Sequence, residues 1–402
     1  MTTEHSHVMG GSSAAQRINC PGSLELEKKA PEQEASDFAA RGSMLHAAIE
    51  LLIVADPATL DDAEPMMQEL VGKNLGFGED HEITEELIDD KLRPAIKTWF
   101  DIVEEYGIDD WFIEQRVSLE TVINGAFGTA DIIAKDSADR LHILDWKFGD
   151  GVPVAAEGNL GLGFYAAGAL YDEDPELQEF TDKISGVVLH IVQPRTGLAK
   201  VDPRDTWETT EAWVESLVNQ AVEAMDKAAL PDAPLKPGSW CRWCRAKAGC
   251  SAHAAMASEA LSKAPESMTA VELADALHKA SLLEDWCKAV VKLAQKELES
   301  GAAVPGWKLV RGRAGARKWI DPDVVADICK KKHLKVAEMY KPRVLLSPTE
   351  MEKRHKKLYC DKLSLEVTSK AAGLTLAPDS DKRPAVTDSM SLLADAMKGA
   401  KK

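Results

Sequence analysis

The sequence lacks both a membrane-length apolar run and a secretory leader. Its longest apolar stretch, residues 44–55, is interrupted by His46 and Glu50, and no basic segment followed by an apolar one opens the chain. We therefore expect an unexported, cytoplasmic protein with no membrane partner. The phosphate-binding motif G-x-x-x-x-G-K-[ST] is also missing, which argues against a helicase motor on this chain.

Positive charge is in deficit. The chain has 48 Lys and Arg against 66 Asp and Glu, which gives a formal net charge of −18. Proteins that coat nucleic acid non-specifically gain most of their affinity by neutralising phosphates. The charge therefore argues against that class of protein, but not against an enzyme with one local basic groove.

The length of the chain favours one large domain with a smaller appendage. It has 402 residues, of which 45% are hydrophobic. We expect a polar, disordered terminus over residues 1–10 and a large domain over residues 11–255. A mostly helical, basic domain over residues 256–379 and a flexible tail over residues 380–402 should follow.

The periodicity of apolar residues predicts an α/β fold. A short helix should begin at Ser12 and end at the Cys20-Pro21-Gly22 turn, since proline and glycine both stop helices. Helical spacing also occurs in residues 36–55, 85–104, 160–170, 209–228 and 271–300. Strand-like segments are residues 111–119, 128–134, 141–148 and 186–192. The order of helix, three strands, helix and strand predicts a mixed sheet whose last strand needs a crossover connection.

Two carboxylates and a lysine fall on neighbouring predicted strands. Asp145 and Lys147 are two residues apart, so both should point to the same face, and Asp131 lies on the preceding strand. Two converging carboxylates repel each other unless a cation lies between them, and Mg²⁺ prefers hard oxygen ligands. The pattern predicts a divalent-metal site for phosphodiester hydrolysis, although an Asp-x-Lys pair alone is also typical of a solvated ion pair.

At this point the sequence resembles a known family, the RecB-like branch of the PD-(D/E)XK nucleases. The likeness covers about residues 10–255 and rests on Arg41-Gly42-Ser43-Met44-Leu45-His46, Gly128-Thr129-Ala130-Asp131, Asp145-Trp146-Lys147 and Tyr165. Two further phrases, Gln193-Pro194-Arg195 and Lys308-Leu309-Val310, extend a likeness to a phage-encoded group of largely undefined function along most of the chain.

The resemblance implies a restriction-endonuclease-like core and a Mg²⁺- or Mn²⁺-dependent DNA exonuclease, serving phage recombination or end processing in the host cytoplasm. DNA would be a partner, together with a recombination or single-strand-binding protein. The implied metal ligands are His46, Asp131 and Asp145, with Lys147 as the catalytic lysine. Glu114 and Tyr165 are further candidate site residues. The alternatives for them are a solvated strand residue and a helix core residue.

One position departs from the family pattern. The family has a glutamine four residues before the tyrosine of this helix, and here that position is Gly161. If the glutamine normally contacts the substrate or the nucleophile, its loss weakens activity or shifts the contact to Asn159. The alternative function is therefore a weak or inactive nuclease fold that binds DNA or a protein.

Seven cysteines, an odd number with three inside ten residues, indicate metal binding rather than a disulfide framework. Cys241, Cys244 and Cys250 are spaced C-x2-C-x5-C, and Cys20 is the candidate fourth ligand. Four thiolates fit zinc or an iron–sulfur cluster on ligand type. One distant cysteine with three clustered ones resembles the cluster-bearing RecB-like nucleases, including AddB, which implies [4Fe–4S] in preference to zinc. We interpret the three other cysteines, Cys287, Cys329 and Cys360, as buried or incidental.

The C-terminal part mixes aromatic and basic residues. The cluster comprises Trp307, Lys308, Arg311, Arg313, Arg317, Lys318 and Trp319, followed by basic runs at residues 330–332 and 353–357. Such a cluster is typical of a surface that grips the DNA backbone and stacks a base on tryptophan. The alternative is an ordinary solvated surface.

Overall fold

The computed structural model describes residues 6–30, 37–77, 81–149, 153–194, 202–261, 268–312, 317–341, 344–368 and 374–378. Its contacts divide the chain into two compact units, Met1–Asp285 and Trp286–Lys402. The division falls inside helix α11 (Ala270–Glu299), whereas the sequence predicts a boundary near residue 255. Helix α10 (Ser251–Leu261) buries His253, Met256 and Ala257 in the first unit, so the change of composition at residue 255 does not end that unit.

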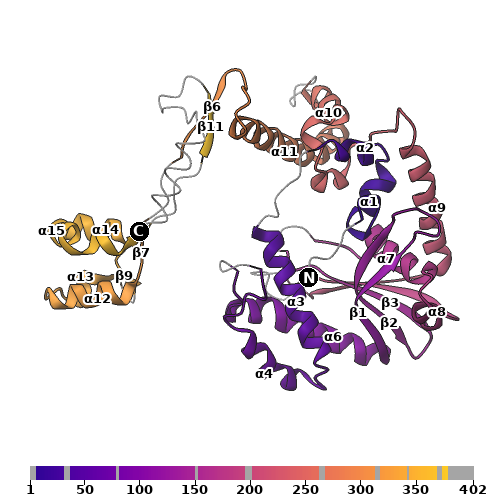
Figure 1. Cartoon of the computed structure of the whole chain (residues 1–402), viewed down its shortest axis with the longest axis horizontal. Helices are drawn as coiled ribbons and strands as arrows, with labels where there is room; N and C mark the ends of the chain where they lie inside the picture. Colours follow the sequence, from indigo (N-terminus) through magenta and orange to yellow (C-terminus); the bar gives the residue numbers. More distant parts are fainter. Residues whose placement is uncertain are drawn as a thin grey trace. The chain divides into compact units, whose positions relative to one another are not determined.

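The centre of the first unit is a five-stranded mixed sheet in the order β1-β2-β3-β4-β5. Its strands are β1 (Ile108–Ser118), β2 (Phe127–Asp136), β3 (Arg140–Trp146), β4 (Gly186–Val192) and β5 (Arg204–Thr209). Only the β3 and β4 pair is parallel, and the chain crosses between them through α7 (Leu160–Tyr171) and α8 (Pro175–Phe180). The predicted mixed α/β fold with a crossover is therefore confirmed (Figure 1).

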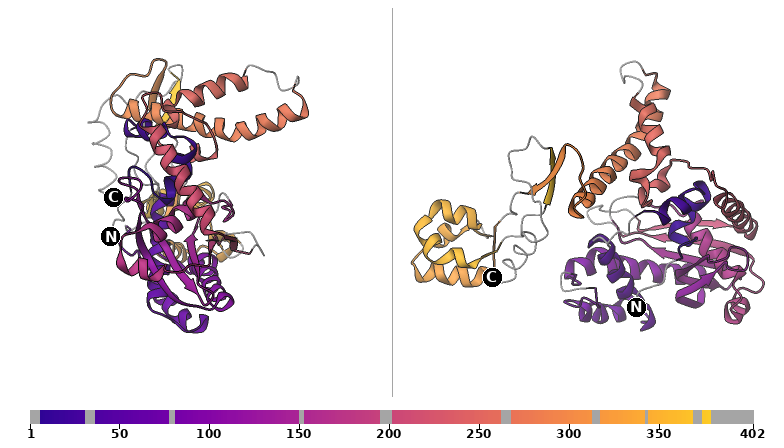
Figure 2. Two further views of the ribbon diagram at one scale, coloured as in Figure 1. Left: turned by 90° about the vertical axis from the view of Figure 1, so that its right-hand side faces the viewer. Right: turned by 45° about the horizontal axis from the view of Figure 1, so that its top comes forward.

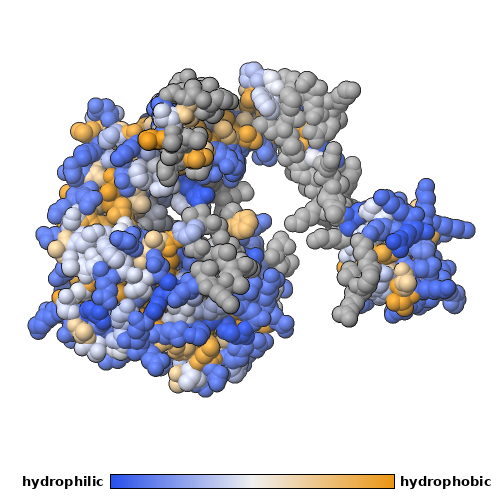
Figure 3. All heavy atoms as spheres, turned by 180° about the vertical axis from the view of Figure 1, so that it is seen from behind, coloured by the Kyte–Doolittle hydropathy of each residue, from blue (hydrophilic) through white to orange (hydrophobic). Residues whose placement is uncertain are grey.

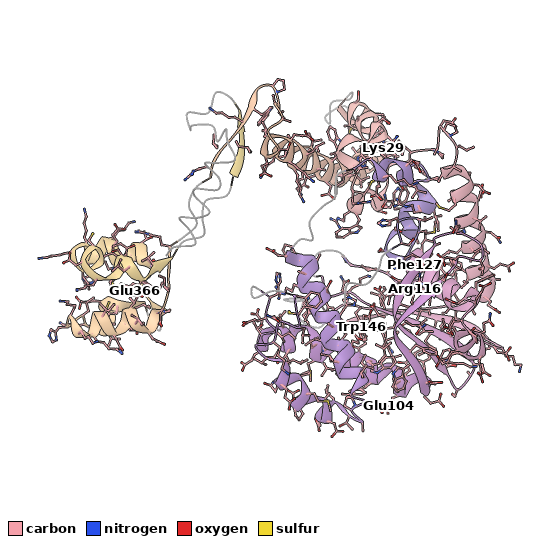
Figure 4. All side chains as sticks on the ribbon, in the orientation of Figure 1. Lys29, Glu104, Arg116, Phe127, Trp146 and Glu366 are labelled. Carbon is pink, nitrogen blue, oxygen red and sulfur yellow. The ribbon has the colours of Figure 1, made fainter. Side chains whose placement is uncertain are left out.

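One face of the sheet is covered by the helices that precede it in the sequence. They are α3 (Asp37–Val54), α4 (Leu60–Leu70), α5 (Glu85–Leu87), η1 (Ile88–Leu92) and α6 (Arg93–Tyr106). Their apolar side chains share one buried cluster with Leu144 and Trp146 of β3. Trp146, labelled in Figure 4, is only 2% exposed. This cluster fixes α3, and with it His46, against the end of β3.

The opposite face is covered by α1 (Gly11–Asn19), α7 and α9 (Glu211–Ala228), visible from two sides in Figure 2. Small residues let α7 approach the strands closely. A Cβ atom on Gly168 would lie 2.7 Å from Cγ2 of Val117, a distance that real Cβ contacts do not show. Asn159 caps the helix because its Oδ1 accepts from the backbone N of Gly161 and Leu162 at 3.0 and 3.1 Å. The helix that carries Tyr165 is thus fixed in position along its axis and against the sheet.

The first described residues are part of this unit. Ser6 Oγ donates to the carbonyl of Gly125 at 2.5 Å, and Met9 is fully buried and forms a bridge with Ala126. The expected disorder over residues 1–10 is therefore wrong for residues 6–10, because these residues cover the turn between β1 and β2 in a way that their polar composition does not reveal. Residues 1–5 lie outside the described part of the chain.

Outside the sheet, the first unit continues through α2 (Ser23–Lys28), η2 (Ser239–Trp243) and η3 (Lys247–Gly249). Side chains also pair along the antiparallel edge of the sheet. Arg116 of β1 lies over the ring of Phe127 of β2, with its Cζ 4.3 Å from the ring centroid (Figure 4).

No helix among the described residues is long and apolar enough to cross a membrane. Hydrophilic residues dominate the face drawn in Figure 3.

The second unit combines short helices with short strands. Its elements after α11 are β6 (Trp307–Arg311), β7 (Lys318–Trp319), α12 (Pro322–Lys331), α13 (Val336–Met339), β8 (Tyr340–Lys341), β9 (Val344–Leu345), α14 (Pro348–Arg354), α15 (Lys356–Leu358), η5 (Tyr359–Leu363), η6 (Ser364–Glu366), β10 (Val367–Thr368) and β11 (Leu374–Pro378). The expectation of a mostly helical appendage misses three antiparallel strand pairs, β6 with β11, β7 with β10 and β8 with β9. Most of these strands have two residues, too few for an alternating pattern to be recognised. The predicted tail over residues 380–402 lies outside the described residues.

A chain of polar side chains crosses the sheet from β2 through β3 and β4 to β5. His142 Nδ1 lies 2.9 Å from His190 Nε2, and His142 Nε2 lies 3.1 Å from Asp136 Oδ2. His190 Nδ1 is in turn 3.0 Å from Thr206 Oγ1. Burial lowers the pKa of both histidines, and for His190 the neighbouring His142 adds to the effect. The folded state therefore holds both rings neutral.

We expect the unfolding free energy to fall as the pH falls below about 6.5, the ordinary histidine pKa, because the unfolded chain then binds protons that the folded chain excludes. Each such proton contributes up to about 1.4 kcal/mol per pH unit. His190→Gln should reduce this slope by about one proton, as measured by urea unfolding at several pH values. The matched control is His333→Gln at an exposed position. An unchanged slope in the His190 variant would contradict the expectation.

Candidate metal site and cysteine centre

Asp131 and Asp145 lie side by side on neighbouring strands. Ile132 of β2 pairs with Leu144 of β3 in antiparallel register, so the residues flanking this pair, Asp131 and Asp145, also face each other. The backbone N of Trp146 donates to Asp131 Oδ2 at 2.6 Å and fixes that carboxylate. The structure thus brings together the two strand carboxylates that the sequence predicts to meet.

Lys147 follows the end of β3 directly. Its backbone N donates to the carbonyl of Val192 at 2.9 Å and so continues the parallel ladder with β4. Its Nζ lies 2.6 Å from Oδ2 of Asp145 in an ion pair. That oxygen is buried, so the ammonium group of Lys147 is what balances its charge. Burial raises the pKa of Asp145, and the charge of Asp131 adds to this although Lys147 opposes it.

Three side chains from three different elements, those of His46, Glu114 and Asp131, converge on one point. One ligand atom from each of His46, Glu114 and Asp131 lies within 4.8 Å of the other two. His46 comes from α3, and its Nδ1 is 3.5 Å from Asp131 Oδ1. Its ring meets that of Phe148 edge-on, with the centroids 5.4 Å apart. An imidazole and two carboxylates at these distances form a possible metal site.

Glu114 occupies an unusual place in β1. The neighbouring residues pair as Ile113 with Ile132 and Gln115 with Ala130, and between these pairs Glu114 lies opposite Asp131 with a φ of 48°. A positive φ is rare for a residue other than glycine and is often found at functional sites. Burial, followed by the charge of Asp131, raises the pKa of Glu114 to about 7. Spacing in the sequence gives no signal for this distortion, so the sequence alone leaves a solvated strand residue as the alternative for Glu114.

The set of converging side chains differs from the predicted set of metal ligands at two residues, Glu114 and Asp145. The sequence assigns Asp145 to the metal and leaves Glu114 nearby, whereas in the structure Glu114 belongs to the converging group and Asp145 is paired with Lys147. Burial opposes protonation of His46, but the charges of Asp131, Asp145 and Glu114 outweigh it and raise the pKa of His46 to about 9. The cluster therefore attracts a positive charge.

Tyr165 reaches toward the same cluster from α7. Burial raises the pKa of Tyr165 well above 10, and Asp145, Asp131 and Glu114 add to the effect. Its ring is enclosed by glycine backbones, since a Cβ on Gly11 would lie 2.2 Å from Tyr165 Cζ and one on Gly128 would lie 3.0 Å from Cε1. The hydroxyl therefore stays protonated and is restricted to a narrow pocket.

Gly161 is explained by the same packing. A Cβ at this position would lie 2.8 Å from the carbonyl oxygen of Gly11, so the backbone of α1 occupies the space that a longer side chain would take. The backbone of α1 thus fills the place where the RecB-like pattern has a glutamine side chain. Asn159, the proposed substitute contact, caps α7 instead.

Gly161→Gln should lower the unfolding free energy by about 1–3 kcal/mol, because the added side chain must displace the backbone of α1. Gly42→Gln is the matched control, since a Cβ at Gly42 has nothing within 4 Å and that position is helical. Urea unfolding of both variants measures the difference. Equal stability of Gly161→Gln and the parent chain would refute the packing explanation.

The four predicted cysteine ligands surround one cavity. Cys20 lies just after α1, and Cys241, Cys244 and Cys250 lie in or beside η2 and η3. All four are buried. Backbone N–H groups donate to two of the sulfurs, from Lys236 to Cys20 at 3.3 Å and from Gly238 to Cys241 at 3.4 Å. Residues more than 200 positions apart in the sequence therefore meet as predicted.

The spacing of these sulfurs bears on what they can hold. Among the described residues, the group around His46 is the only set of three or more His, Cys, Asp or Glu whose ligand atoms lie within 4.8 Å of one another, so no three of the thiols do. A tetrahedral zinc ion with Zn–S bonds of about 2.3 Å brings its sulfurs to roughly 3.8 Å from one another. Burial raises the pKa of Cys244 to about 12, with Glu27 adding to the effect, so a cation bound to this sulfur would favour its thiolate form.

Comparison with known proteins identifies the family but not the activity. The family described as "Protein of unknown function (DUF2800)" matches residues 5–384. The chain belongs to this family. A solved structure described as "Crystal structure of SSO0001" is similar at 13% identity with a TM-score of 0.26, over 60% of this chain and 84% of that chain. Similarity at this level carries no structural argument.

The match to the DUF2800 family includes the basic C-terminal region, where two of the residues predicted to contact DNA also make contacts within the second unit. Arg317 Nη2 pairs with Glu352 at 2.5 Å, and its Nη1 donates to the hydroxyl of Tyr359 at 2.8 Å. Trp319 Nε1 donates to the carbonyl of Leu346 at 2.9 Å. Trp307 is 45% exposed and remains accessible, while Arg313 lies outside the described residues. Trp319 is partly buried and packs against the apolar cluster of the second unit.

Proposed function

We propose that this member of the DUF2800 family is a metal-dependent DNA nuclease of the RecB-like PD-(D/E)XK class. The observation that carries the proposal is the convergence of His46, Glu114 and Asp131 beside the ion pair of Asp145 and Lys147. The order of elements supports it, since helices, three antiparallel strands, α7 and the parallel strand β4 follow the order that the resemblance implies.

The residues present fit a divalent cation. Three carboxylates and one imidazole gather in a partly buried place, and the structure compensates for their charge by favouring a proton on His46. A divalent cation held by His46, Glu114 and Asp131 would replace that proton. Carboxylate oxygens suit Mg²⁺ and Mn²⁺, and the imidazole favours Mn²⁺ of the two.

The side chains have separate roles in hydrolysis. When bound, the cation supplies a polarised phosphate oxygen and a water of lowered pKa. The N–H of Trp146 keeps Asp131 oriented toward the site, and Asp145 holds the ammonium group of Lys147. Lys147 then donates to the attacking water or to the charge that develops on the phosphate. Tyr165 supplies a neutral hydroxyl that can donate a hydrogen bond.

We propose linear DNA as the substrate, with exonucleolytic cleavage in phage recombination or end processing and a recombination or single-strand-binding protein as a partner. The resemblance to RecB-like nucleases is what supports these finer assignments. Five residues contribute to the candidate site from α3, β1, β2 and the end of β3, and among them the side chain of Lys147 is 42% exposed and accessible to a substrate.

We further propose that Cys20, Cys241, Cys244 and Cys250 hold a [4Fe–4S] cluster. Four buried thiols line one cavity, and four thiolates are a ligand set that such a cluster takes. The resemblance to cluster-bearing RecB-like nucleases is what favours the cluster over zinc. The N–H groups of Lys236 and Gly238 are suited to stabilise thiolate charge.

The direct test is cleavage of end-labelled linear and circular DNA by the anaerobically purified chain, with Mn²⁺ or with EDTA. An exonuclease shortens the linear DNA in Mn²⁺ and leaves the circle intact, whereas an endonuclease cuts both. The alternative, an inactive nuclease fold that binds DNA or a protein, is favoured by Gly161 and predicts DNA retention without cleavage. Absence of Mn²⁺-dependent cleavage on either substrate would reject the nuclease.

A further inference from the structure

The cavity bounded by the four cysteines has one more polar residue in its wall. His253 of α10 lines this cavity and is only 2% exposed. Neither Nδ1 nor Nε2 has a hydrogen-bond partner among the described residues. A buried polar group without a partner costs about 1–3 kcal/mol, so such groups in native structures call for an explanation.

The position of His253 indicates where its partner lies. It follows Cys250 by three residues on the first turn of α10, so the segment that supplies the third clustered thiol also brings the imidazole to the cavity. The other buried histidines of the sheet, His142 and His190, have partners for their ring nitrogens. His253 therefore differs from an ordinary buried histidine in having none.

We propose that His253 donates a hydrogen bond to a sulfur of the cysteine-ligated centre and thereby raises its reduction potential. The inference rests on the proposed [4Fe–4S] cluster but not on nuclease activity. Four thiolates complete the protein ligands of such a cluster, which leaves the imidazole as a donor rather than a ligand.

The chemical reason is the charge of the centre. A neutral imidazole has one N–H donor, and a thiolate or bridging sulfide accepts it. Reduction adds one negative charge to the cluster, so a donated hydrogen bond stabilises the reduced state more than the oxidised one. Hydrogen bonds to the sulfurs are among the factors that set the potentials of iron–sulfur proteins. The centre is then poised for electron uptake in addition to joining the two ends of the domain.

The experiment compares three variants of the full chain, purified without oxygen. His253→Phe and His253→Met remove the donor but keep an apolar or polarisable side chain, and His253→Gln keeps an N–H donor. The reduction potential is measured by redox titration followed by absorbance and electron paramagnetic resonance, with iron content determined on each preparation. We expect the Phe and Met variants to have lower potentials than the parent and the Gln variant to stay close to it.

The outcomes separate cleanly. Equal potentials in the parent and in the iron-loaded Phe or Met variant overturn the proposal. If neither donor-free variant retains iron but the Gln variant does, the potential of the Gln variant decides: a value close to that of the parent supports the donor, and a clearly lower value overturns the proposal. If the Gln variant loses iron together with the other two, or if the purified parent contains zinc without iron, the proposal fails. Mn²⁺-dependent DNA cleavage by the same preparations is scored separately, so loss of one conclusion does not decide the other.

Discussion

Asp131→Asn is expected to lower the rate of DNA cleavage by about a thousandfold. The side chain belongs to the proposed metal group and also faces Asp145, so the substitution removes charge from both. A catalytic cation contributes several kcal/mol to the transition state, and about 4 kcal/mol corresponds to that factor. Steady-state cleavage of linear DNA in Mn²⁺ measures the rate, and calorimetric titration with Mn²⁺ should show weaker binding.

The control for this substitution is Asp110→Asn. Asp110 is an exposed carboxylate on β1 that pairs across the sheet with Lys135, so its neutralisation should leave both cleavage and Mn²⁺ binding unchanged. Asparagine at position 131 keeps an oxygen that can accept from Trp146 and relieves repulsion with Glu114 and Asp145. It also loses the pairing with His46, which outweighs burial and holds the pKa of Asp131 below its ordinary value, so the variant should be less stable than the parent without metal. Undiminished cleavage by the Asp131 variant would rule out the proposed site.

Cys20→Ala is expected to cause the largest loss of stability. Cys20 and Cys241 are separated by 221 residues (241 minus 20), and a ligated centre closes this loop. By analogy with a disulfide, closure of a loop of this length stabilises the fold by about 3–5 kcal/mol. For a domain of this size each kcal/mol shifts the melting temperature by about 2–4 °C. We therefore expect the melting temperature to fall by roughly 6–20 °C.

Cys244→Ala should lower the melting temperature in the same direction, because it removes another ligand of the same centre. Cys360→Ala is the matched control, since Cys360 is exposed and lies in the second unit. Iron content should fall in the first two variants and stay constant in the control. A Cys20 variant that loses its iron and melts at the temperature of the parent would show that the centre does not stabilise the domain.

The local pattern of apolar residues was sufficient to predict most of the sheet strands and longer helices of the first unit. Strand β4 begins and ends where its apolar run predicts, and the crossover follows from two parallel strands that one segment must connect. The pattern failed for β5, whose edge position leaves it without a regular buried face. It also joined α5, η1 and α6 into one helix, because Pro94 at the start of α6 and the wider turn before it keep the same apolar face.

The candidate site was predictable only in part. Asp131, Asp145 and Lys147 were found because strand alternation fixes which side chains share a face, and the four cysteines were found because their spacing is unusual. Glu114 was underestimated because its role depends on a backbone distortion in β1. His253 was missed altogether, since in the sequence a histidine near the cysteines looks like any other, and only its surroundings show that it has no hydrogen-bond partner among the described residues.

The sequence by itself determined the mixed α/β order, the facing carboxylates on neighbouring strands and the set of cysteines, because each depends on local periodicity or on residue type. The tertiary structure alone decided that Glu114 joins His46 and Asp131, that α1 fills the space beside Gly161, and that Cys20 and His253 reach one cavity. The physical reason is that these contacts join segments distant in the chain. Their distances are set by how helices and strands pack, and no single segment encodes that packing.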